Sequence, residues 1–315
     1  MTNSKAFDSQ STPSQVSHIH EKGAKISDYN VVSAFSNPRT VTINRVLGHV
    51  FRRPYLSVPP EASFLQLGTF LAIGYQIYVD GLIVAIDKKL VGRISGKHIL
   101  DHLLKMNYDE WSSVRASDLM DGNTSSVEMD SSLSSLFELF AETNFALAPI
   151  TTKSSLVGSI VIRDLLPLIS ELNLDTPVER VGTPIVRISM NETLKNSIDI
   201  MLKKKIRNLV VSPAGDYNNK NDNYIVNDRM ILEYIFSYEG RKIMTEGVGA
   251  TALDNVSLDS LDMRAASSIS ENQTISKTAT MLRDINTPAL IFKNNIVTPW
   301  DVVMKSIGKE YLVDV

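Results

Sequence analysis

The sequence contains no cysteine and few histidines, and both absences narrow the chemistry open to the chain. Without cysteine it has no disulfide, no thiolate nucleophile and no thiolate metal ligand, which fits a reducing cytoplasm. No apolar run is long enough to cross a membrane, and the N-terminus lacks a secretory pattern. We therefore expect a soluble cytoplasmic protein.

Histidine is confined to the first third of the chain, at His18, His20, His49, His98 and His102. A histidine-based catalytic or metal centre is therefore excluded from the rest. His98 and His102 stand four residues apart on an expected helix and could face one metal ion, but Ile99 stands where zinc proteases have glutamate. We interpret them as a surface pair and expect no metal site.

The charge and the motifs that are missing exclude further classes of function. The chain has 32 Lys and Arg against 35 Asp and Glu, a net charge of −3, so the charge does not favour nucleic acid as a partner. It has no Walker loop, no Gly-x-Ser-x-Gly elbow and no His-Glu-x-x-His motif. We expect no catalytic residues and therefore no enzyme.

A pattern returns four times after an N-terminal segment, residues 1–36, that we interpret as a flexible tail. Each copy ends with a short apolar strand, a turn and the start of a helix. The equivalent helix positions are His98, Asp164, Met230 and Asp301, at spacings of 66, 66 and 71 residues. Spacing this regular indicates a true internal repeat.

Each copy also begins alike, with an apolar strand followed by a polar turn and an amphipathic helix. Ser63, Ser132, Thr193 and Thr274 stand where the N-cap of that helix is expected. The unit is thus strand, helix, strand, strand, helix, an α/β fold. The copies, called one to four, span about residues 37–108, 109–174, 175–245 and 246–315.

This unit resembles the CBS domain, the repeat named after cystathionine β-synthase. The resemblance implies two Bateman modules, residues 37–174 (copies one and two) and 175–315 (copies three and four), able to form a flat disc. The layout is similar to the gamma subunit of AMP-activated protein kinase and to stand-alone prokaryotic CBS proteins. Such a chain is expected to be regulatory, with an adenine nucleotide or S-adenosylmethionine as its ligand and no required cofactor.

The family's ligand motif is Gly-x-x-Thr/Ser-x-x-Asp, where the last strand meets the last helix. A helix N-terminus suits a phosphate, and the Asp carboxylate accepts hydrogen bonds from a ribose. Copy four keeps Thr298 and Asp301, and copy two keeps Gly158 and Asp164. Copies one and three lack the acidic residue and look degenerate. The resemblance therefore marks copies two and four as the candidate ribose-binding copies.

A basic segment, Lys203 to Arg207, precedes the middle strand of copy three. In similar proteins cationic side chains at this place meet ligand phosphates, and Arg207 is the best match. The same residues also fit a solvated helix end, where lysines complement the helix dipole.

Simpler roles remain open for the other candidates. Asp164 and Asp301 suit helix capping regardless of function. Trp300 either stacks on a base or packs within the protein.

Two hypotheses of function follow from the sequence. The first is a sensor that binds an adenosine-containing molecule between paired copies and signals to a protein partner of unknown identity. The second is a ligand-free scaffold for protein–protein interaction. Neither requires a membrane, and both leave room for a homodimer.

Overall fold

The computed structural model describes residues 39–50, 53, 55–74, 80–213, 223–247 and 249–308. The expected tail, residues 1–36, and most of the polar loop of copy three lie outside the described residues. Among the described helices, none is both long enough and apolar enough to cross a membrane.

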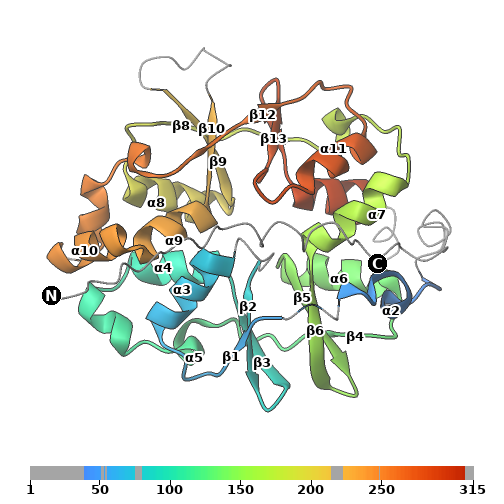
Figure 1. Ribbon diagram of the computed structural model, residues 1–315, viewed down its shortest axis with the longest axis horizontal. Helices are drawn as coiled ribbons and strands as arrows, with labels where there is room; N and C mark the ends of the chain where they lie inside the picture. Colours follow the sequence, from blue (N-terminus) through green and yellow to red (C-terminus); the bar gives the residue numbers. More distant parts are fainter. Residues whose placement is uncertain are drawn as a thin grey trace, which may run out of the picture. The chain divides into compact units, whose positions relative to one another are not determined.

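All four copies form the predicted strand–helix–strand–strand–helix unit, so the α/β repeat is confirmed. Figure 1 shows each copy as a small sheet with its own helices. In copies one and two the elements are β1 (Ser57–Val58), α3 (Phe64–Gly74), β2 (Leu82–Ile86), β3 (Lys89–Ile94), α4 (Gly96–Leu103), β4 (Val127–Glu128), α6 (Leu133–Thr143), β5 (Leu147–Thr152), β6 (Ser155–Val161) and α7 (Leu166–Glu171).

Copies three and four follow the same order, and the last helix of copy four is π-helical. Their elements are β8 (Arg187–Ser189), α8 (Leu194–Lys204), β9 (Asn208–Ser212), β10 (Tyr224–Asn227), α9 (Asp228–Phe236), β12 (Ser267–Ser268), α11 (Ile275–Leu282), β13 (Leu290–Phe292), β14 (Asn295–Val297) and η8 (Asp301–Gly308).

The remaining elements lie before the unit of copy one, between the units of successive copies or, in copy two, between the last strand and the last helix. They are α2 (Ile43–Leu47), η3 (Tyr108–Ser112), α5 (Ala116–Leu119), η4 (Ile162–Leu165), η5 (Val178–Arg180), β7 (Thr183–Pro184), α10 (Tyr238–Glu246), η6 (Gly249–Asn255), η7 (Leu258–Ser260) and β11 (Arg264–Ala265).

The sheet of every copy is built in the same way. The first strand pairs parallel with the second, and the second pairs antiparallel with the third. In copies three and four a fourth strand comes from the other copy. β7, which leads into copy three, pairs with β14 of copy four, and β11, which leads into copy four, pairs with β10 of copy three.

The four predicted N-cap residues are confirmed. Ser63, Ser132, Thr193 and Thr274 each accept a hydrogen bond from the backbone N–H three residues later, at 3.2–3.4 Å. Each also bridges to the segment that leads into the other copy of its pair: Ser63 to Arg115, Ser132 to Thr42, Thr193 to Ser257 and Thr274 to Pro177. The copies therefore interlock in the pairs one with two and three with four.

Helices make a second set of contacts, between the pairs. α3 of copy one packs along α9 of copy three, and α7 of copy two packs along α11 of copy four. A large apolar core lies between copies one and three, where Phe64 is tilted against Trp111 and Phe236 and the last two rings stack on each other. Each copy thus contacts one copy through its sheet and another through its helices.

One residue breaks the apolar packing between the paired sheets. The Arg93 side chain on β3 is fully buried, and its three guanidinium nitrogens have no hydrogen-bond partner among the described residues. The equivalent positions in copies three and four hold Ile225 and Ile296, which pack in an apolar cluster. Arg93 has instead the Phe145 ring, 5.1 Å from its guanidinium carbon.

We expect Arg93→Met to stabilise the protein by about 1–4 kcal/mol, because methionine keeps the apolar stem and removes an unsatisfied buried charge. The free energy of unfolding in urea would measure the gain. Arg115→Met is the control, because that arginine is partly exposed and donates to the Ser112 carbonyl. Loss of stability in Arg93→Met alone would mean that the guanidinium contributes favourably.

Candidate functional site

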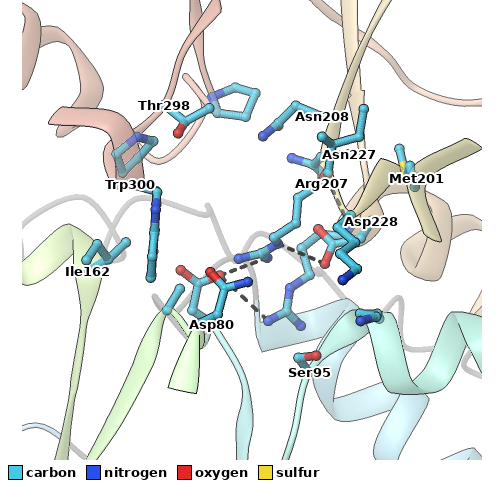
Figure 2. A pocket seen from close by; sticks show the side chains of 18 of the residues that line it. Asp80, Ser95, Ile162, Met201, Arg207, Asn208, Asn227, Asp228, Thr298 and Trp300 are labelled. Carbon is cyan, nitrogen blue, oxygen red and sulfur yellow. Dashed lines mark hydrogen bonds and ion pairs between the residues drawn. The ribbon is translucent and has the colours of Figure 1, made fainter. Parts of the chain in front are cut away.

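Residues from all four copies line one cavity of about 650 Å³. Two of its sides differ in chemistry. Trp300 and Ile162 lie on one side, and Arg207, Asn208 and Asp228 lie on the other (Figure 2). The cavity thus offers an apolar, partly aromatic wall opposite a charged wall.

The strand–helix junctions that carry the sequence motif are capped by their own side chains. The backbone N–H of Val161 donates to Asp164 at 2.7 Å, and that of Thr298 donates to Asp301 at 2.9 Å. In copy one the Ser95 N–H donates to the imidazole Nδ1 of His98 at 3.0 Å. Histidine therefore caps the helix of copy one at the position where copies two and four use aspartate.

Copy three reaches the same result with a different residue. Met230 has no side-chain oxygen to cap the helix, and the Asn227 carboxamide accepts from the N–H groups of Arg229 and Met230 at 3.0 and 2.9 Å. All four junctions are thus satisfied locally, so capping alone accounts for the residue type at this position.

Asp301 and Thr298 both line the cavity, as a ligand site in copy four requires. The Asp301 carboxylate is nevertheless fully engaged within the protein. One oxygen accepts from the Thr298 backbone N–H and from its hydroxyl at 2.7 Å; the other accepts from the Thr183 hydroxyl at 3.0 Å and meets the Lys305 ammonium at 2.7 Å. Four donors fill the acceptor sites of a carboxylate. A ribose would therefore have to replace one of them.

Asp164 and Gly158 of copy two are not among the residues that line the cavity. The Asp164 carboxylate is buried and holds the Arg53 guanidinium in a two-pronged ion pair, at 2.7 and 2.8 Å. Burial raises the pKa of Asp164 above its ordinary value, although Arg53 acts in the opposite direction. Gly158 lies within β6, opposite Ile150 of β5. The two motif copies are thus not equivalent in space.

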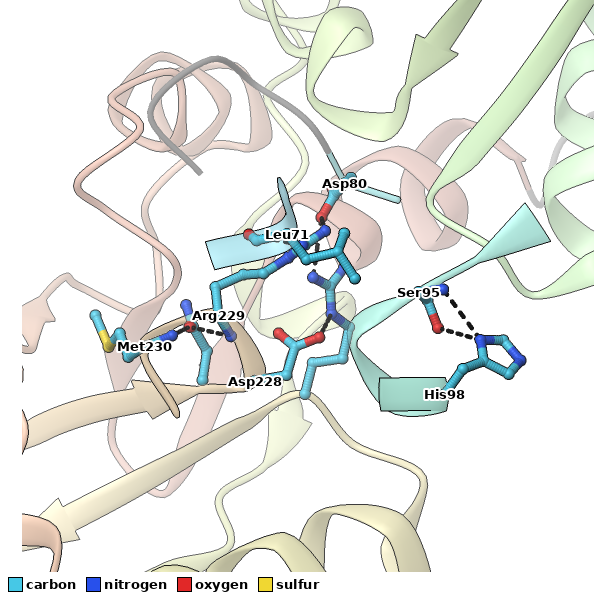
Figure 3. A network of polar contacts seen from close by, with 9 residues as sticks. Leu71, Asp80, Ser95, His98, Asp228, Arg229 and Met230 are labelled. Atoms are coloured by element: carbon cyan, nitrogen blue, oxygen red, sulfur yellow. Dashed lines mark hydrogen bonds and ion pairs between the residues drawn. The ribbon is translucent and has the colours of Figure 1, made fainter. Parts of the chain in front are cut away.

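Arg207 lies on the charged wall, in an ion-pair network that joins copies one and three. Its Nη2 is 2.9 Å from Asp80 Oδ1, and its Nε donates to Asp228 Oδ2 at 3.0 Å. Arg229, also of copy three, reaches the Leu71 carbonyl of copy one at 3.1 Å and lies 3.8 Å from the same Asp80 oxygen (Figure 3).

Two members of this network, Arg207 and Asp80, have shifted pKa values. Burial by itself lowers the pKa of Arg207, but Asp228 and Asp80 raise it above its ordinary value. Burial likewise raises the pKa of Asp80, and the charges of Arg207 and Arg229 outweigh it and hold that pKa below its usual range. The opposite charges of Asp80 and Arg207 therefore favour the ionised form of each other.

The sequence reasoning missed Asp80, Asp228 and Arg229. Asp228 and Arg229 follow β10 directly, two and one residues before the motif position of copy three, so the comparison of motif positions passed over them. Asp80 precedes β2 in a segment without a motif. The sequence signal that could have pointed to them is that Asp228 and Arg229 stand side by side at the start of a helix.

The two histidines of α4 do not behave as a simple surface pair. The His98 ring stacks on Phe145 with centroids 5.5 Å apart, and the carbonyl of His98 lies 3.1 Å from His102 Nδ1. Burial lowers the pKa of His98 below its ordinary value. Within the described part of the chain, no cluster of three or more His, Asp or Glu side chains could hold a metal ion.

Trp300 lines the cavity half-buried, with its ring edge-on to Phe140 at 6.4 Å between centroids. It therefore packs within the protein and also faces the cavity. Packing within the protein is one of the two roles that the sequence left open for Trp300, and stacking on a base stays a prediction.

Comparison with known proteins identifies the repeat. Residues 116–171, which lie in copy two, match the family model of the CBS domain. No curated protein sequence matches the chain. The fold is similar to that of protein MJ1225 from Methanocaldococcus jannaschii, a candidate archaeal homologue of γ-AMPK. The two share 18% identity with a TM-score of 0.70, over 84% of this chain and 99% of that protein.

Two other solved structures are similar at lower scores. An uncharacterised conserved protein from Pyrococcus horikoshii shares 14% identity over 81% of this chain and 96% of its own, with a TM-score of 0.49. The CBS domain pair of protein MJ0100, in complex with 5′-methylthioadenosine and S-adenosyl-L-methionine, shares 15% identity over 41% of this chain and 95% of its own, with a TM-score of 0.33.

Proposed function

We propose that this chain, in which residues 116–171 match the CBS domain, is a regulatory protein that senses an adenine nucleotide or S-adenosylmethionine. The observation that carries the proposal is the two-sided cavity among the four copies. A nucleotide has a flat apolar base at one end and an anionic group at the other, and the cavity has walls of both kinds.

The proposed ligand lies with its base against Trp300 and Ile162 and its phosphate toward Arg207. Its ribose lies near Thr298 and Asp301, where it replaces the Thr183 hydroxyl or Lys305 as a donor to the carboxylate. Asp164 and Gly158 form a second, latent position in copy two, which requires Arg53 to leave the Asp164 carboxylate. The ligand acts as a signal, so the protein needs no catalytic residue and no resident cofactor.

A ligand bound in this cavity would lie next to residues of all four copies. Because its walls come from all four copies, a ligand that contacts both walls changes the relative stability of the contacts between them. We propose that a cytoplasmic protein partner responds to that change.

We expect isothermal titration calorimetry to detect binding of at least one of AMP, ADP, ATP and S-adenosylmethionine. Asp301→Asn should weaken that binding about tenfold or more, because a charged hydrogen bond to the ribose is lost while the cap acceptor remains. Asp199→Asn is the matched control, since Asp199 pairs with a lysine four residues away, as Asp301 does, but does not line the cavity. Absence of heat with every adenine compound at millimolar concentration would contradict the sensing function.

The alternative is a ligand-free scaffold. The observation that favours it is that Asp301 and Arg207 already have charged partners within the protein. A purified complex with a protein partner whose stability is unaffected by nucleotides would support this function.

A further inference from the structure

Asp80 stands where an anionic ligand would have to bind Arg207. Asp80 belongs to copy one and lies just before β2. Its Oδ1 is 2.9 Å from Nη2 of Arg207, across the boundary between copies one and three. Arg229 approaches the same oxygen at 3.8 Å. In Figure 2 Asp80 lies between Trp300 of the apolar wall and Arg207 of the charged wall.

The two carboxylates on Arg207 have different surroundings. The Asp228 side chain is 5% exposed and lies against the start of α4, where a Cβ added to Gly96 would be 2.5 Å from its Oδ2. The Asp80 side chain is 19% exposed, and that of Arg207 is 41% exposed. Asp228 is therefore the fixed partner of Arg207, and Asp80 is the partner that a ligand can reach.

The charges around the cavity favour an anion overall. Six lysines and arginines line it, and four aspartates line it with them. Two of those aspartates, Asp80 and Asp228, form ion pairs with Arg207. The cavity thus attracts anions from a distance but presents an already neutralised guanidinium at its charged wall.

We infer that Asp80 is an internal competitor of ligand phosphate: a phosphate binds Arg207 only by displacing Asp80. The inference rests on the proposed function, which places the base of the ligand against Trp300. It extends that function by stating which ligands, according to their number of phosphates, the cavity prefers. Each added phosphate meets more repulsion from Asp80, so Asp80 selects for ligands of low charge. Displacement also breaks the Asp80–Arg207 tie, and so couples phosphate binding to the contact between copies one and three.

The test compares the full-length wild type with Asp80→Asn by calorimetry, in the absence of divalent cations. The probes are inorganic pyrophosphate, adenosine, AMP and ATP. Asp80→Asn should bind pyrophosphate and ATP about tenfold or more tightly than the wild type, because one unit of nearby negative charge is removed. The gain should be smaller for AMP and absent for adenosine.

Asp121→Asn is the matched control, because Asp121 lines the same cavity but has no ion pair with Arg207. An equal gain in this control would overturn the inference, since any lost carboxylate would then suffice. An unchanged affinity of Asp80→Asn for pyrophosphate would overturn it as well. If Asp80→Asn fails to fold, Asp80→Ser removes the same charge.

Hydrogen exchange on the wild type tests the displacement without any substitution. Saturating pyrophosphate should speed exchange in α3, because Asp80 leaves Arg207, and unchanged or slower exchange there would contradict the displacement. The adenosine experiment separates the two claims. A gain in pyrophosphate binding without any binding of adenosine compounds removes the proposed function and leaves the role of Asp80 standing.

Discussion

Replacing Gly68 by alanine should destabilise the protein by about 3 kcal/mol, the upper part of the range for overpacked cores. Gly68 lies within α3, and a Cβ there would come 1.8 Å from the end of the Phe236 ring. That ring is fixed between Phe64 and Trp111, so it has little room to move. In an exposed helix the same substitution would stabilise by about 1 kcal/mol, so the sign of the effect is diagnostic.

Urea unfolding of Gly68→Ala would measure the loss. The double variant Gly68→Ala with Phe236→Leu should recover part of it, because the smaller side chain makes room for the new methyl group. Stabilisation by the single substitution would show that Phe236 yields freely and that α3 and α9 do not require this close approach.

Replacing Asp228 by alanine should cost about 2–3 kcal/mol of stability, less than the ~3–5 kcal/mol of a fully buried ion pair, because the Arg207 side chain is 41% exposed. Its carboxylate holds Arg207 at 3.0 Å, and the neighbouring Arg229 side chain is only 3% exposed. Without Asp228, Asp80 alone would have to balance two guanidinium groups in a largely buried place. The free energy of unfolding near neutral pH measures the effect.

Asp199→Ala provides the comparison for Asp228. Asp199 also pairs with a cation, Lys195 at 3.3 Å, but both side chains are substantially exposed. Its replacement should change stability by less than about 1 kcal/mol, because exposed pairs contribute little. If both variants lost the same free energy of unfolding, burial would not make the interaction of Asp228 with the two arginines stronger than an exposed ion pair.

Local patterns in the sequence were enough to predict the repeat. The order of strands and helices and the four N-caps depend on spacing, helix periodicity and short polar side chains, all of which act within a few residues. The motif position also proved to be a local device, since His98, Asp164 and Asp301 each cap their own helix.

The composition of the candidate site could be predicted only in part. Thr298, Asp301 and Arg207 do line one cavity, as their positions in the motif and the basic segment suggested, whereas Asp164 does not. Nothing within copy two indicates that Arg53, from a different copy, takes the Asp164 carboxylate. Partners this far apart along the chain leave no local signal.

The sequence by itself thus determined the unit, its fourfold repetition and its local caps. Only the tertiary structure decided which copies exchange strands, which carboxylates face the cavity, and that Asp80 and Asp228 pair with Arg207. The physical reason is that hydrogen bonds within a turn are set by neighbouring residues. The partner of a buried charge is set instead by which surfaces pack together, and here α3 and α9 bring copy one against copy three.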